Sequence, residues 1–107
     1  MDDEDCGAGD RACRHWSVFN IPLNVTSLKA GEDPGAIDGV TQGSNYLGKE
    51  GYAGPCPPSQ HTYRITVFAL DGGAPRVDKG AEMNRAKFQS KYGQHILGSA
   101  TIAGTYP

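Results

Sequence analysis

Apolar and polar positions alternate most regularly over residues 61–70, and this alternation predicts a β-strand. One face of this strand carries His61, Tyr63, Ile65, Val67 and Ala69, and the other carries Thr62, Arg64, Thr66, Phe68 and Leu70. We expect the apolar part of the first face to point into the core. His61 and Tyr63 would then be the two polar side chains that complete a buried face at the start of the strand.

Three further elements follow from shorter patterns. Residues 15–22 are rich in aromatic and β-branched side chains and end at a proline, which predicts a strand covered on both sides. Residues 81–92 are predicted to be helical, because Phe88 and Tyr92 share a face and Gly93 is placed to cap the end. Residues 99–106 are predicted to form a final strand.

The remaining residues lack periodicity. Residues 1–14 form an acidic entry segment and a loop, and residues 23–60 are rich in glycine and proline. A long irregular segment is unusual in a compact domain, so we expect it to be functional or tied down by short strands. With 15 glycines and 7 prolines among 107 residues, the composition favours a turn-rich, mainly β fold. The length suits a single domain over residues 1–107.

Composition excludes several classes of protein and site. The net charge of −2 provides no basic field for nucleic acid or an anionic membrane surface. No apolar run approaches the ~20 residues that cross a bilayer, and the acidic start does not resemble a signal peptide. The chain contains no P-loop, no G-x-G-x-x-G, no C-x-x-C and no paired histidine spacing, so neither a cofactor nor a metal is expected.

The cysteines are odd in number: Cys6, Cys13 and Cys56. Cys6 and Cys13 flank a short loop whose spacing permits a disulfide. Three reduced cysteines in a cytosolic protein are the alternative. A disulfide here would favour an extracytoplasmic, periplasmic location over a cytoplasmic one.

Candidate binding residues gather at the starts of the two strongest predicted strands. His61 and Tyr63 lie two residues apart and project together, and His15 begins the other strand. If the first segment is extended, Asp3 and Asp5 also share a face. A charged imidazole and a phenol suit a phosphate oxygen, while carboxylates orient imidazoles or bind an ammonium. From spacing alone, the simpler interpretation, that both histidines only satisfy strand-end backbone groups, is favoured.

The loop Gly54-Pro55-Cys56-Pro57-Pro58 precedes His61 and is stiffened by its prolines. It suits a preformed ligand rim, and a plain rigid connection is the alternative. An enzymatic interpretation pairs Cys56 with a histidine, but nothing marks this thiol as activated and no G-x-S-x-G motif occurs. Asp3 and Asp5 are neighbours on one acidic stretch, which does not suit the separated carboxylates of a glycosidase. We therefore expect no catalytic activity.

Four segments, in order along nearly the whole chain, resemble the phosphatidylethanolamine-binding proteins, and most closely their bacterial Raf-kinase-inhibitor-like branch. They are residues 15–22, residues 54–58, His61-Thr62-Tyr63, and the stretch from His95-Ile96-Leu97 to Gly104-Thr105-Tyr106. The resemblance implies a β-sandwich with a short helix in the C-terminal half. It also implies a pocket for phosphate, acetate or phosphoethanolamine-like groups, with ligand residues Asp3, Asp5, His15, Gly54, Pro55, Pro57, His61 and Tyr63.

The chain departs from the family pattern at three places. Asp3-Glu4-Asp5-Cys6-Gly7 stands where the family has Asp-Pro-Asp-Ala-Pro, so both aspartates are kept and both prolines are lost. Thr62 replaces the arginine of the family's His-Arg-Tyr. Family members usually carry additional strands before the aspartate motif. We therefore expect an incomplete sandwich with an open sheet edge and exposed apolar faces. Such a monomer would be marginally stable. Dimerisation or strand exchange could cover the open edge and the apolar faces.

These features predict a module that binds phosphorylated head groups or similar small anions. The alternative is a protein-interaction role, such as that of a kinase- or protease-inhibitor-like regulator, in which the pocket gates a partner surface. The resemblance supports this alternative as well, because the family includes kinase-inhibiting and signalling members.

Overall fold

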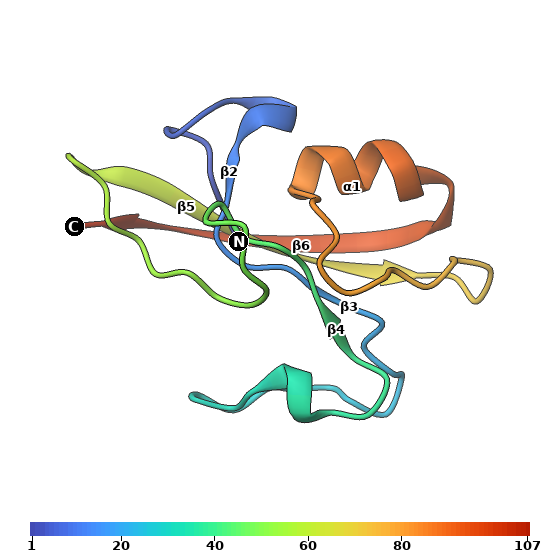
Figure 1. Cartoon of the computed structure of the whole chain (residues 1–107). Coiled ribbons are helices and arrows are strands. Elements are labelled where there is room, and N and C mark those ends of the chain that lie inside the picture. The colour runs from blue at the N-terminus through green and yellow to red at the C-terminus, as the bar shows by residue number, and fades with distance from the viewer.

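A computed structural model of the protein describes all residues from Met1 to Pro107 (Figure 1). The strands are β1 (Asp2–Asp3), β2 (Cys13–Arg14), β3 (Val18–Phe19), β4 (Thr41–Gln42), β5 (His61–Leu70) and β6 (Ile96–Tyr106). The helix α1 spans Arg85–Tyr92, and 3-10 turns cover Gly9–Arg11, Pro34–Ala36 and Gly93–His95. The prediction of a mainly β chain with one short helix in its C-terminal half is confirmed. None of the helices has the length and apolar character required to cross a bilayer.

The strands form two antiparallel sheets. The larger has the order β2-β1-β5-β6, and the smaller pairs β3 with β4. The ladder between β5 and β6 is the longest, running from His61 opposite Tyr106 to Leu70 opposite Ile96, with one irregularity near Leu70. The short strand β1 pairs with the start of β5, and β2 pairs with the other side of β1.

The bounds of β5 agree with those predicted from its alternation. The helix begins later than predicted, at Arg85, because the Asn84 side chain caps it by accepting a hydrogen bond from the Lys87 N–H. Gly93 follows the helix in a right-handed conformation and opens a 3-10 turn, so it does not act as a left-handed cap. β6 begins at Ile96, three residues before the predicted start at residue 99.

The predicted strand over residues 15–22 is wrong in extent, since only Val18–Phe19 is a strand. Asn20 interrupts it with a positive φ of 60°. The Asn20 side chain accepts from the Val77 N–H and donates to the Val77 carbonyl, which holds this backbone in place. In residues 23–60, β4 and an isolated bridge between Ser44 and Glu50 supply the short strand pairing that was expected there.

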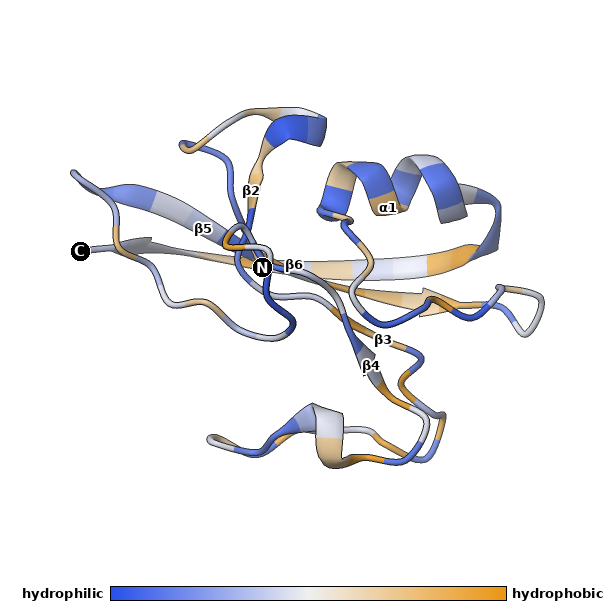
Figure 2. Ribbon diagram, viewed as in Figure 1, coloured by the Kyte–Doolittle hydropathy of each residue, from blue (hydrophilic) through white to orange (hydrophobic).

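The core lies between α1 and one face of β5. The Phe88 ring of α1 lies 6.1 Å from Phe19, 5.1 Å from Phe68 and 4.8 Å from Tyr92, measured between ring centroids. Val77 completes the buried cluster, and Leu70 and Ile96 are among the side chains packed against it. Figure 2 shows α1 above the long ladder, with apolar residues distributed along both of its strands.

The prediction that Ile65, Val67 and Ala69 point into the core is wrong. All three are exposed, with Val67 65% accessible, whereas Phe68 and Leu70 from the opposite face pack on the core cluster. Both faces of β5 carry apolar residues, so alternation alone could not determine which face α1 covers. Only the start of the first face, at Tyr63, is buried.

Candidate functional site

A cavity of about 110 Å³ lies where the start of β5 meets β1, β2 and the proline-rich loop. It is lined by Asp3, Cys6, Cys13, His15, Tyr46, Cys56, Pro57, Pro58, His61 and Tyr63. The structure thus brings together five of the residues proposed as ligand contacts, namely Asp3, His15, Pro57, His61 and Tyr63. Segments far apart in the sequence meet here because β1 pairs with both β2 and β5.

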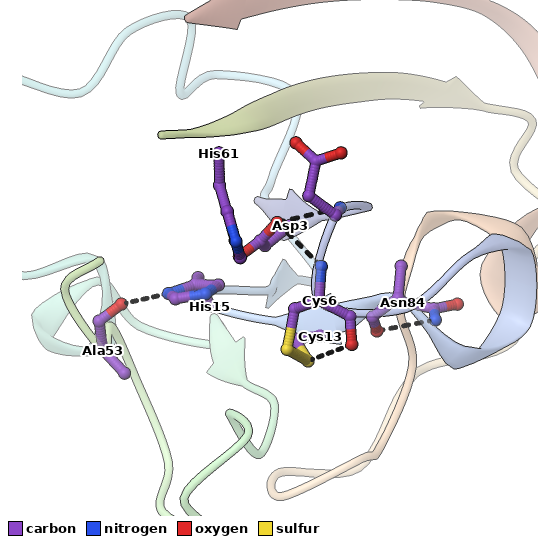
Figure 3. The surroundings of a disulfide bond; sticks show 9 residues. Asp3, Cys6, Cys13, His15, Ala53, His61 and Asn84 are labelled. Atoms are coloured by element: carbon purple, nitrogen blue, oxygen red, sulfur yellow. Dashed lines mark hydrogen bonds and ion pairs between the residues drawn. A yellow bond between two sulfur atoms is a disulfide. The ribbon is translucent and has the colours of Figure 1, made fainter. Parts of the chain in front are cut away.

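Asp3 orients His61 (Figure 3). The Asp3 carboxylate is buried, and its Oδ2 atom lies 2.7 Å from His61 Nδ1. Its Oδ1 atom accepts hydrogen bonds from the backbone N–H groups of Asp5 and Cys6, at 3.0 and 3.1 Å. Because the carboxylate accepts, the proton is on His61 Nδ1 and the Nε2 atom is left without a protein partner.

A hydrogen bond from Nδ1 also fixes the ring of His15. Its Nδ1 atom donates to the Ala53 carbonyl at 2.8 Å, since a carbonyl can only accept. The buried ring lies 4.8 Å from the Tyr46 ring and 5.2 Å from the Tyr63 ring, which it meets edge to face. Its Nε2 atom, like that of His61, has no partner within the protein.

Tyr63 contributes a third unpaired polar atom. Its side chain is buried, and its hydroxyl lies near the Asp3 carboxylate without a hydrogen bond of ordinary geometry. Burial raises the pKa of the Tyr63 phenol, and the neighbouring negative charge of Asp3 raises it further. The hydroxyl therefore stays protonated, as a donor, throughout the physiological pH range.

The raised pKa of Tyr63 predicts a specific loss of stability in alkali. An unfolded tyrosine ionises near pH ~10, and the folded phenol does so only at higher pH. Between these values the unfolded state binds fewer protons, so the free energy of unfolding falls as pH rises. Urea unfolding at pH values on both sides of ~10 should show a steeper loss in the wild type than in Tyr63→Phe. The exposed Tyr106→Phe variant should retain the wild-type slope; equal slopes in all three proteins would contradict the assignment.

Three other proposed ligand residues lie elsewhere. Asp5 does not share a face with Asp3, because β1 ends at Asp3 and the chain turns back onto its carboxylate. The Asp5 Oδ2 atom instead accepts from the Thr62 N–H at 2.7 Å. Gly54 and Pro55 do not line this cavity. Pro55 lines a second cavity of about 260 Å³, with mainly apolar walls, which shares Tyr63 with the first.

Tyr46 lines the cavity and was missed by sequence reasoning, whereas Pro58, which also lines it, belongs to the loop predicted as a ligand rim. Tyr46 follows Asn45, whose buried side chain accepts from the Leu47 N–H and donates to the Gly51 carbonyl. The Tyr46 N–H donates to the Arg14 carbonyl at 2.7 Å and so fixes the ring beside His15. No periodicity marks this loop, and the turn residues around Tyr46 are the only signal.

Cys6 and Cys13 are joined by a disulfide with a Cα–Cα distance of 5.6 Å, whereas Cys56 is a free, exposed thiol. Cys13 pairs with Asp3 across β1 and β2, and the Cys6 N–H binds the Asp3 carboxylate. The disulfide therefore closes the loop between β1, which carries Asp3, and β2 (Figure 3). Backbone hydrogen bonds and this link hold the turn where the family has its prolines.

The cavity lining contains no lysine or arginine, so the imidazoles of His15 and His61 are the only lining side chains that can become positively charged. His95, the third histidine, lies outside the cavity and pairs with Asp71 at 2.9 Å. This contact lowers the pKa of the Asp71 carboxyl. No group of three or more histidine, cysteine, aspartate or glutamate side chains is arranged to hold a metal ion.

Comparison with known proteins places this geometry in a family. A profile described as Phosphatidylethanolamine-binding protein matches residues 1–107. A UPF0098 protein of Chlamydia pneumoniae is 38% identical over 93 residues, covering 86% of this chain and 57% of that protein. One from Methanothermobacter thermautotrophicus is 37% identical over 106 residues, covering 96% of this chain and 68% of the relative.

A solved structure is similar over nearly the whole chain. Escherichia coli YbcL, described as a new member of the mammalian PEBP family, superposes with a TM-score of 0.78 at 32% identity. The match covers 98% of this chain but 66% of YbcL, so the chain spans about two thirds of that structure. The profile match and these relatives show that the chain belongs to the phosphatidylethanolamine-binding protein family, in the branch that contains the UPF0098 proteins and YbcL.

Proposed function

We propose that the protein binds a small oxyanion, of the phosphate or phosphorylated head-group class, in the 110 Å³ cavity, and that it acts by binding without catalysis. One observation carries this proposal. Three polar atoms without protein partners, the Nε2 atoms of His15 and His61 and the hydroxyl of Tyr63, belong to side chains that line the same small cavity.

The chemistry of these groups fits an oxyanion. Each Nε2 becomes a charge-assisted donor when its imidazole is protonated, and the Tyr63 hydroxyl donates in its neutral form. A buried hydroxyl without a partner is costly, so a ligand oxygen that accepts from Tyr63 removes this cost. The cavity is well below the ~300 Å³ of typical pockets for drug-sized ligands, and so suits a phosphate-sized group.

The supporting contacts favour an anion over a cation in the inner part of the cavity. Both oxygens of Asp3 are already bonded, one to His61 and the other to two backbone N–H groups. The carboxylate therefore holds His61 in place rather than offering itself to a ligand ammonium. Pro57 and Pro58 form a stiff wall, which limits the entropy lost on binding.

Binding without catalysis agrees with the orientation of the imidazoles. A nucleophilic Cys56 would need a base in hydrogen-bond contact, and neither histidine makes such a contact with its sulfur. Each Nδ1 atom is already committed, to the Ala53 carbonyl or to Asp3.

Nuclear magnetic resonance of the histidine ring protons tests this proposal. Inorganic phosphate and phosphoethanolamine should each shift the His15 and His61 signals at constant pH, while His95 serves as an internal control. His61→Ala and Tyr63→Phe should each weaken phosphate binding by about tenfold or more, since each removes one donor to a charged group, worth ~1.4 kcal/mol or more. His95→Ala should bind like the wild type. Unshifted His15 and His61 signals at millimolar phosphate would overturn the proposal.

A further inference from the structure

All three cysteines of the chain line the cavity proposed as the anion site. Cys6 and Cys13 are joined by a disulfide, and Cys56 is a free thiol that reaches the same cavity from the proline-rich loop. Because the cavity measures only about 110 Å³, the thiol and the disulfide face one small space. A thiolate attacks a disulfide that it can reach, so this arrangement is chemically reactive.

Two observations place the sulfur atoms toward this space. Figure 3 shows the disulfide on the side of its loop where His15 lies. The pKa of the Tyr63 phenol is raised mainly by burial and, among smaller contributions, by the negative charge of Cys56, so the Cys56 sulfur lies within electrostatic range of this phenol. Prolines on both sides of Cys56 stiffen its backbone. The reacting groups are therefore held near each other before any reaction, which favours an intramolecular step.

We propose that the three cysteines form a thiol–disulfide exchange site, in which the Cys56 thiolate attacks the Cys6–Cys13 disulfide and moves the bond across the cavity. The attack forms one S–S bond, from Cys56 to either Cys6 or Cys13, and breaks the existing one. The sulfur that leaves takes the electron pair and then a proton from solvent, which replaces the proton that Cys56 released. The chain holds one disulfide and one thiol before and after the step, so no external oxidant or reductant is required.

The absence of a histidine contact to the Cys56 sulfur agrees with this chemistry. Acyl transfer by a cysteine depends on a general base in the site. Exchange depends only on the thiolate, which forms by loss of a proton to solvent. The site therefore suits disulfide exchange and does not need the catalytic apparatus of a cysteine hydrolase.

Exchange and anion binding should exclude each other, a consequence that rests on the proposed function. A bond from Cys56 to the opposite wall crosses the space that the anion would occupy. It also opens the original link beside Asp3, whose carboxylate accepts from the Cys6 N–H. A bound phosphate would lie between the thiol and the disulfide. By linkage, phosphate should then shift the equilibrium toward the Cys6–Cys13 form, and the exchanged form should bind phosphate weakly.

Disulfide mapping by mass spectrometry tests the proposal on the intact chain. Protein carrying the Cys6–Cys13 bond is incubated without oxidant or reductant at pH ~8.5, quenched in acid and blocked with N-ethylmaleimide. Trypsin cleaves after Arg11, between Cys6 and Cys13, so the original and the moved disulfides give different peptides. Part of the protein should contain Cys56 in a disulfide. The rate should not depend on protein concentration and should be at least about tenfold lower at pH ~6.5, where less thiolate is present.

Moving the thiol out of the cavity provides the matched control. The double variant Cys56→Ser with Ser59→Cys keeps one thiol in the same segment, at an exposed position that does not line the cavity. It should exchange at least about tenfold more slowly than the wild type, because the thiol no longer faces the disulfide. Equal rates in the two proteins would overturn the proposal, as would a wild type in which Cys56 remains the only thiol.

Millimolar phosphate separates the exchange site from its coupling to the anion. Phosphate should lower the exchanged fraction of the wild type at least severalfold. An exchanged fraction that phosphate leaves unchanged would refute the coupling while the exchange site stands. Failure of the proposed function itself appears in a different measurement, as histidine signals that phosphate does not shift.

Discussion

Replacing Phe88 with alanine is expected to lower the free energy of unfolding by about 3–4 kcal/mol, the usual cost of removing a buried phenylalanine ring. Phe88 joins three parts of the chain, because its ring contacts Phe19 of β3, Phe68 of β5 and Tyr92 of its own helix. The buried cluster around it has only four members, so little remains to fill the space. In a domain whose total stability is of order 5–15 kcal/mol, this loss is large.

Urea unfolding followed by circular dichroism measures this effect, and the melting temperature should fall by roughly 15 °C. Phe88→Leu retains much of the apolar volume and should lose clearly less stability than the alanine variant. Tyr52→Ala removes an aromatic ring that is 60% exposed and should change stability by less than ~1 kcal/mol. A loss in Phe88→Ala no larger than in Tyr52→Ala would show that α1 does not anchor the core.

The elements that sequence predicted well are those whose information is local. The alternation over β5 extends for ten residues and specifies both of its ends. The strand predicted over residues 15–22 failed because Asn20 takes its shape from Val77, 57 positions away in the chain. A contact with so distant a partner cannot be recognised from local periodicity, although it overrides the β-propensity of the flanking residues.

The same distinction between local and distant information separates the residues of the candidate site that could be predicted from those that could not. His15, His61 and Tyr63 could be selected because strand starts and the family motif both indicate them, and the structure places them together. Asp5 could not be placed, since its position depends on how the chain turns after Asp3 once the two prolines are absent. Tyr46 comes from an irregular loop and reaches the cavity through a single backbone bond to Arg14.

Asp3 is the residue on which the fold and the proposed anion site depend together. Asp3→Ala removes the buried carboxylate that accepts from two backbone N–H groups and from the His61 Nδ1–H in part-buried hydrogen bonds. Donors that lose their acceptor cost up to about 1–3 kcal/mol each, and hydration and relaxation of the turn recover part of this. We expect Asp3→Ala to lose ~3 kcal/mol of stability and to abolish phosphate binding. Asp10→Ala, an exposed aspartate outside the cavity, should change neither quantity measurably.

Asp3→Asn separates the two roles, because the amide oxygen can still accept from the Asp5 and Cys6 N–H groups while its NH₂ faces His61 Nδ1. Two donors then oppose each other, so the imidazole must turn or move its proton to Nε2, and the ring loses the orientation that Asp3 gives it. We expect this variant to keep its stability within ~1 kcal/mol and still to bind phosphate at least about tenfold more weakly. Urea unfolding and phosphate titration of the same samples measure both effects. Wild-type phosphate affinity in Asp3→Asn would show that the carboxylate supports the turn alone, and that its contact with His61 is not required for anion binding.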